Sequence, residues 1–154
     1  MFKILIIEDD IHKLESLCGF TRRHLLNAVI VTATSLNDAI ESIDNDVFNL
    51  ILIDMAIPSH PILPGEGSPI PFLSGGLEVI LELSSLGRED DCIIVTQYPE
   101  IEVCGNTYKV DNAKENINSL LECNVVECIE YSEGDSSWKK KLKETISVYE
   151  NFNP

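Results

Sequence analysis

Five short apolar runs recur along the chain, and this pattern constrains the fold more than any other feature. The runs cover residues 2–7, 28–33, 48–53, 92–96 and 125–129. They are rich in β-branched side chains and do not alternate between polar and apolar residues. Such continuous runs are typical of strands that are buried on both faces, as in a parallel sheet. The sequence therefore predicts a parallel sheet of five strands.

Segments with helical spacing separate these runs. Ser35 is a candidate N-cap for a helix whose apolar face carries Leu36, Ala39 and Ile43. Further helices are expected after the first run, where Leu14 and Leu17 share a helical pattern, after the pair of glycines at 75–76, over about 112–122, and from 136 to about 149. Strand and helix thus alternate five times, which favours an α/β fold of the flavodoxin-like, doubly wound kind, with helices on both faces. Its functional site is expected at the carboxyl ends of the strands.

The chain is long enough for one domain, and we expect residues 1–154 to form it. Two segments do not fit regular structure. Residues 59–74 are rich in proline and glycine, and residues 97–111 carry Pro99 and Gly105. We expect both to be extended loops that form a docking surface beside the site. Trp138 is expected to pack on the core with Leu142 and Ile146.

The charge of the chain excludes some partners. Lys and Arg total 11 against 26 Asp and Glu, a formal net charge of −15. Such a surface repels nucleic acid, because affinity for it depends on cations that neutralise phosphates. The sequence has no apolar run near the ~20 residues of a membrane span and no leader-like start. We therefore expect a cytoplasmic protein without nucleic-acid or membrane partners. The five cysteines are expected to be reduced, mostly buried thiols and not zinc ligands.

Acidic residues follow two of the expected strands. Glu8 and Asp9 come directly after the first, and Asp54 comes after the third. In a parallel sheet both points lie on the same edge, so three carboxylates should converge there. Like charges at close range are costly unless a cation joins them, and an all-oxygen cluster suits Mg²⁺. The alternative is that these acids are polar strand ends that cap the following helices.

Four short motifs together resemble the receiver domains of response regulators in two-component signalling. Residues 4–10 (ILIIEDD) resemble the first strand and acidic pair, and residues 52–58 (LIDMAIP) resemble the acceptor motif. Residues 76–80 (GLEVI) resemble the start of the third helix, and residues 93–96 (IIVT) resemble the fourth strand with its terminal switch threonine. The likeness covers nearly the whole chain in the correct order.

The resemblance implies that Asp54 accepts a phosphoryl group from a histidine kinase or phosphotransfer protein. It also implies that Asp9 and Asp54 bind Mg²⁺ directly, that Glu8 binds it largely through water, and that the backbone carbonyl of Ala56 completes the protein ligands. Thr96 would turn the modification into a surface change, although it also suits a plain strand end. Such a stand-alone receiver would signal by contact with a downstream protein target and would not be an enzyme in its own right.

The chain departs from the family pattern at the end of the fifth strand. The family places a lysine there, usually followed by proline, whereas this chain has Tyr131 and Ser132. No lysine lies near in sequence, and Lys109 is the candidate that could reach over the site. Gln97, after the switch threonine, is bulkier than usual and could restrict access to Asp54 or bond its oxygens.

These departures leave a second hypothesis open. The chain could be a pseudo-receiver, an interaction module that no longer depends on phosphorylation. A phosphatase of the haloacid dehalogenase type is disfavoured, because it needs an acid two residues after the nucleophile and position 56 is alanine. A flavodoxin is also disfavoured, because its first loop needs hydroxyl residues and here that loop is acidic.

Overall fold

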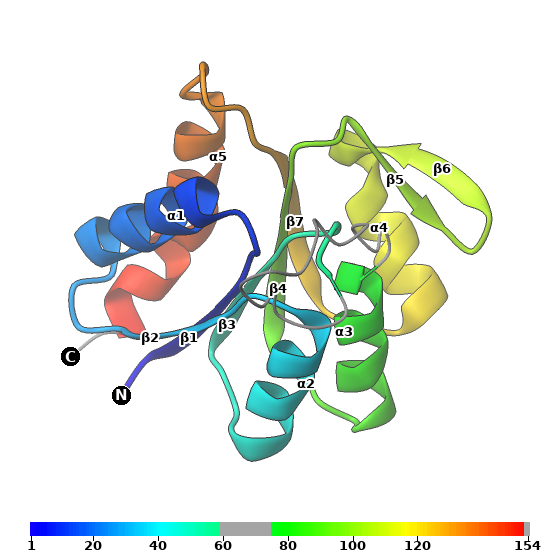
Figure 1. Cartoon of the computed structure of the whole chain (residues 1–154), viewed down its shortest axis with the longest axis horizontal. Helices are drawn as coiled ribbons and strands as arrows, with labels where there is room; N and C mark the ends of the chain where they lie inside the picture. The colour runs from blue at the N-terminus through cyan, green and yellow to red at the C-terminus, as the bar shows by residue number, and fades with distance from the viewer. Residues whose placement is uncertain (59–74, 153–154) are drawn as a thin grey trace, which may run out of the picture.

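A five-stranded parallel sheet forms the centre of the computed structural model, which describes residues 1–58 and 75–152 (Figure 1). Its strands are β1 (Lys3–Ile7), β2 (Val29–Ala33), β3 (Leu50–Ile53), β4 (Asp91–Thr96) and β7 (Val125–Glu130). They lie in the order β2-β1-β3-β4-β7, and every neighbouring pair is parallel. The predicted flavodoxin-like fold class is confirmed.

Helices cover both faces of the sheet (Figure 1). One face carries α1 (Ile11–His24), α5 (Ser137–Ile146) and the short 3₁₀ helix η1 (Ser147–Phe152). The other carries α2 (Leu36–Asn45), α3 (Gly75–Ser85) and α4 (Val110–Leu121). The core accordingly has two layers, one on each side of the sheet. Trp138 is buried in the layer under α1 and α5, as predicted.

Side-chain caps fix the starts of two helices. The Ser35 hydroxyl accepts a hydrogen bond from the backbone N–H of Asp38 at 3.1 Å, which confirms the predicted N-cap of α2. Asp10 caps α1 in the same way, by accepting from the N–H of Lys13 at 2.9 Å. Each cap satisfies one of the N–H groups that a helix leaves without a partner in its first turn. The Asp10 cap therefore fixes the start of α1 next to the acidic loop that follows β1.

The interpretation of residues 97–111 as irregular is wrong. They contain an antiparallel hairpin of β5 (Glu100–Val103) and β6 (Asn106–Lys109), and α4 begins directly after it. Ile101 and Val103 alternate with exposed glutamates and join the core. The turn between β5 and β6 consists of Cys104 and Gly105, both with positive φ, as a type I′ hairpin turn requires. The other predicted loop, 59–74, lies outside the described residues.

The structure also bears on the predicted lack of a membrane span and on the predicted reduced cysteines. Within residues 1–58 and 75–152, no helix is both long and apolar enough to cross a membrane. All five cysteines are free. Cys18, Cys92 and Cys128 are buried as predicted, Cys123 is half-buried, and Cys104 is exposed in the hairpin turn.

Candidate functional site

The register of the sheet brings the predicted acids together. Ile7 of β1 pairs with Ile53 of β3, so the residues that follow them leave the sheet side by side. The backbone N–H of Asp54 donates to the Ile7 carbonyl at 3.0 Å. Oxygens from the carboxylates of Glu8, Asp9 and Asp54 all lie within 4.8 Å of one another, and we call these three residues the acidic cluster. The predicted convergence is confirmed.

A lysine that sequence reasoning missed sits inside this cluster. The Nζ atom of Lys13 lies 2.6 Å from Glu8 Oε2 and 3.1 Å from Asp54 Oδ1. It also donates to the Val95 carbonyl at 2.8 Å and to Gln97 Oε1 at 3.2 Å. The Lys13 side chain is only 1% exposed. Four oxygens therefore surround one buried ammonium.

Helical periodicity could have predicted that Lys13 is buried. It lies four residues before Leu17 and seven before Phe20, so all three share one face of α1. Leu17 and Phe20 are buried against the sheet. A lysine on the same face must find a buried partner, because an unpaired ammonium in a core is very costly. The family resemblance directed attention to the end of the last strand instead.

Glu8 is held from two sides. Its Oε1 accepts from the backbone N–H of Asp10 at 3.0 Å. Its Oε2 makes the 2.6 Å contact with Lys13, but outside hydrogen-bonding geometry, and it has no hydrogen bond among the described residues. The attraction between Glu8 and Lys13 is therefore mainly Coulombic. Because Asp10 also caps α1, the same short loop orients both the acid and the lysine.

Burial makes the negative charges of the cluster costly. It raises the pKa of Glu8 to about 8, although the neighbouring Lys13 ammonium lowers it. It also raises the pKa of Asp54, again against the opposing effect of Lys13. Low dielectric surroundings disfavour the charged form of a carboxyl group, and a nearby cation favours it. One ammonium contacts Glu8 and Asp54 and leaves Asp9 without a cation among the described residues, so the cluster still attracts positive charge.

The structure also places Thr96, Gln97 and Lys109, which the sequence analysis named. The Thr96 hydroxyl accepts from the backbone N–H of Tyr98 at 3.2 Å and, within the described part of the chain, has no bond to Asp54. Gln97 is exposed, and its side-chain oxygen accepts from Lys13. Lys109 ends β6 and is exposed; among the described residues it makes no ion pair with the cluster. The sequence-based search for a nearby lysine therefore named the wrong one.

Tyr131 lies beside the ammonium of Lys13. Its ring centroid is 5.4 Å from Nζ, within the range of a cation–π contact. Its backbone N–H donates to the Thr96 carbonyl at 2.7 Å, which fixes the chain beyond β7 against the end of β4. On its other side the ring packs against Trp138 at 4.9 Å between centroids. The family's lysine position thus faces the lysine of α1.

The first turn of α3 lies directly against the backbone of Asp54. The N–H of Gly76 donates to the Met55 carbonyl at 3.1 Å. A Cβ atom at Gly76 would lie 2.6 Å from the carbonyl oxygen of Asp54 and 3.0 Å from Met55 Cα. Only glycine allows this approach without a shift of the backbone. Gly76 therefore supports the position of Asp54.

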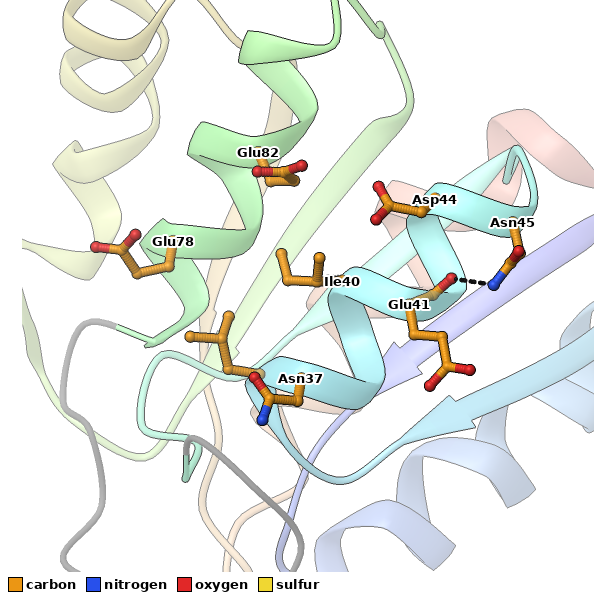
Figure 2. Close-up of a pocket in the computed structure, with 8 residues that line it drawn as sticks. Asn37, Ile40, Glu41, Asp44, Asn45, Glu78 and Glu82 are labelled. Atoms are coloured by element: carbon orange, nitrogen blue, oxygen red, sulfur yellow. Dashed lines mark hydrogen bonds between the residues drawn. The ribbon is translucent and has the colours of Figure 1, made fainter.

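A surface groove of about 630 Å³ lies elsewhere, between α2 and α3 (Figure 2). Its walls carry Glu41, Asp44, Glu78 and Glu82, with Ile40 between them (Figure 2). None of its lining residues belongs to the acidic cluster. Carboxylates line it without a described cation, so it does not suit an anionic phosphodonor. We therefore place the candidate site at the acidic cluster.

Solved receiver structures share this fold. The chain superimposes on response regulator protein TrrA of Thermotoga maritima, solved in complex with Mg²⁺-BeF, with a TM-score of 0.60 and 19% identity, covering 94% of this chain and 99% of that one. A CheY-like receiver domain protein of Methanospirillum hungatei gives a TM-score of 0.59 at 19% identity, covering 99% and 96%. At these identities the likeness concerns the fold alone.

A curated relative shows the family, although no family model matches the chain. The chain belongs to the response regulators, and it is a receiver domain of two-component signalling. The relative is the Detocs response regulatory protein DtcB of Vibrio alginolyticus. It is 34% identical over 153 residues, which cover 93% of this chain and 98% of the relative.

Proposed function

We propose that this receiver accepts a phosphoryl group on Asp54 and signals through contact with a protein partner. One observation carries the proposal: Asp54 follows a central strand and meets Glu8, Asp9 and the Lys13 ammonium at a single point. Phosphoryl transfer needs little covalent chemistry from the protein, and depends on positioning and on opposite charge near the phosphorus. The acidic cluster and Lys13 supply an acceptor and a fixed cation.

The proposed transfer forms one bond and breaks one. A carboxylate oxygen of Asp54 attacks the phosphorus of the donor, and the bond from phosphorus to the leaving group breaks. The leaving group takes the electron pair: it is the imidazole nitrogen of a phosphohistidine, or the acetate oxygen of acetyl phosphate. The product is an acyl phosphate on Asp54. A histidine kinase or phosphotransfer protein is the proposed physiological donor, in the cytoplasm.

The acidic cluster also fits Mg²⁺ by its chemistry. Mg²⁺ prefers a few carboxylates together with water and phosphate oxygens. Asp9 and Asp54 would hold the ion directly, Glu8 through water, and the Ala56 carbonyl would complete the protein ligands. When bound, Mg²⁺ neutralises charge on the transferring phosphoryl group. The Mg²⁺-BeF complex of the structurally similar TrrA supports this assignment.

A pseudo-receiver is the second candidate, and the burial of the acceptor favours it. Asp54 is 3% exposed, and Lys13 already occupies its Oδ1. A buried ion pair of this kind can serve structure alone. In that case the protein would act through its surface in one fixed state, and a phosphodonor would leave it unmodified.

Intact mass spectrometry after incubation with acetyl phosphate and Mg²⁺ separates the two candidates. We expect a mass increase of one phosphoryl group in the wild type and none in Asp54→Asn. Asp9→Asn serves as the metal-site variant and should slow the gain. A gain that persists in Asp54→Asn contradicts the site assignment. No gain in the wild type with acetyl phosphate or a phosphohistidine donor establishes the pseudo-receiver.

A further inference from the structure

Four oxygens form a shell around the Lys13 ammonium. Nζ contacts the carboxylates of Glu8 and Asp54, the Val95 carbonyl and the Gln97 amide oxygen, all between 2.6 and 3.2 Å. The Val95 carbonyl belongs to β4, and the other three groups come from the segments that follow β1, β3 and β4. An ammonium so enclosed is part of the site and not a solvated side chain, because its exposed fraction is 1%.

We propose that Lys13 is a further active-site residue: its ammonium is the resident cation of the acidic cluster and pairs with the phosphoryl group once Asp54 carries it. The inference rests on the proposed acceptor role of Asp54. It names the residue that supplies positive charge in a chain whose last strand ends in Tyr131 instead of a lysine. That charge comes from the first helix.

Charge balance supports the assignment. A phosphoryl group adds between about 1.5 and 2 negative charges near neutral pH, next to Glu8 and Asp9. Three other basic residues of the described chain pair elsewhere: Lys3 with Asp46, Arg88 with Asp90, and Lys141 with Asp111. Among the described residues, Lys13 is the cation in ion-pair contact with the acidic cluster. The new charge therefore meets this ammonium first.

The contacts of Lys13 allow it to follow the modification. Two of its four partners, the Val95 carbonyl and Gln97 Oε1, are neutral oxygens. An ammonium is attracted more strongly to a negatively charged oxygen than to a neutral one at the same distance. A phosphoryl oxygen on Asp54 is thus the better acceptor, and the flexible four-carbon stem of lysine permits the small movement. Gln97, released from Nζ, would carry the change to the surface.

The same geometry makes Lys13 and a metal ion compete for the same carboxylate oxygens. Glu8 Oε2 and Asp54 Oδ1, which contact Nζ, are carboxylate oxygens that Mg²⁺ would also attract. Two cations on shared oxygens repel each other. We therefore expect Mg²⁺ to bind the wild type weakly, and to bind Lys13→Met several-fold more tightly. Trp138, which packs on Tyr131 beside Lys13, provides a fluorescence signal for this titration.

Tyr131 offers a rescue that a purely structural lysine would not show. Its ring is 5.4 Å from Nζ, so a lysine placed there can bring an ammonium back to the same carboxylates. The test compares the rate of mass gain from acetyl phosphate in wild type, Lys13→Met, Lys13→Met with Tyr131→Lys, and Lys141→Met. Lys141 pairs with Asp111 on the surface and serves as the matched control for loss of one positive charge.

We expect Lys13→Met to slow the gain at least about tenfold, because a charge-assisted contact to the phosphoryl group is lost. The rate of mass gain in the double variant should recover to within a few-fold of the wild-type rate. The rate in Lys141→Met should equal that of the wild type. A Lys13→Met protein that is folded by circular dichroism and modified at the wild-type rate overturns the inference. So does a folded double variant that shows no recovery.

A measurement on the unaltered site covers the case in which these variants do not fold. In protein labelled with ¹⁵N-lysine, and assigned with Lys13→Arg, the Lys13 Nζ resonance should shift when Mg²⁺ and beryllofluoride are added, while that of Lys141 stays. An unchanged Lys13 resonance in a protein that does gain the phosphoryl group refutes the role of Lys13. A wild type that gains no mass refutes the proposed function instead, and the Mg²⁺ titration then still tests Lys13 as the resident cation.

Discussion

Single residues decide whether the acidic cluster is tolerable inside the protein. Glu8, Lys13 and Asp54 are each at most 3% exposed, and burying such charges costs several kcal/mol per ion unless each finds a partner. Lys13 provides the partner for both acids, and the N–H of Asp10 supports Glu8 further. Removal of one member leaves the others uncompensated. The three side chains therefore act as a unit and not as independent contacts.

Gly76 gives a prediction at the same scale. Gly76→Ala should lower the free energy of unfolding by about 1–3 kcal/mol, as overpacking of a core does, because the new Cβ meets the carbonyl oxygen of Asp54 at 2.6 Å. Helix propensity alone would favour alanine by nearly 1 kcal/mol, so a net loss identifies the clash. Urea unfolding measures the difference.

Gly134→Ala is the matched control for this substitution. A Cβ atom at Gly134 would meet no other atom within 4 Å, and Gly134 does not adopt a positive φ. Its replacement should leave stability nearly unchanged. If Gly76→Ala proves as stable as Gly134→Ala, the close approach of α3 to Asp54 does not constrain position 76.

Elements differ in how well the sequence predicted them. The five parallel strands were predicted within one or two residues, because each is a dense apolar run, although the edge strand β2 is largely not buried. The hairpin at 100–109 was missed for a physical reason. Its strands have four residues each, and β6 (NTYK) is polar. Its turn is built on Cys104-Gly105 and not on the common Asn-Gly pair.

The candidate site was predicted in the same uneven way. The convergence of Glu8, Asp9 and Asp54 follows from strand order, so the sequence could reveal it. The position of Lys13 depends instead on how α1 rotates over the sheet. That rotation is set by the packing of Leu17 and Phe20 and by the Asp10 cap. Motif comparison examines the family's lysine position after the last strand, and it gives no information about a lysine in α1.

The hairpin turn gives a prediction at the element scale. Cys104 has φ +52°, a conformation that costs most L-residues roughly 1–2 kcal/mol but suits asparagine. Cys104→Asn should therefore raise the free energy of unfolding by a few tenths of a kcal/mol or more, and Cys104→Val should lower it by about 1 kcal/mol. Urea unfolding of the three proteins tests this order. Equal stability of the asparagine and valine variants would contradict the turn geometry.

At the scale of the whole molecule, the net charge of −15 dominates long-range interactions. We expect no retardation of a random DNA duplex in a mobility-shift assay at low salt, where electrostatic attraction is strongest. A lysine-rich DNA-binding domain in the same buffer is the positive control. Clear retardation by the receiver, lost at high salt, would show a basic surface that the described residues do not reveal.

The shell around Lys13 also orders events during folding and synthesis. Nζ meets partners that lie 41, 82 and 84 residues further along the chain, at Asp54, Val95 and Gln97. Contacts between residues so far apart in sequence form only after loop closure has ordered the chain between them. A nascent polypeptide therefore cannot assemble this shell until residue 97 has left the ribosome and β4 has paired with β3. A kinase that requires the assembled shell would act on native molecules and ignore incomplete ones.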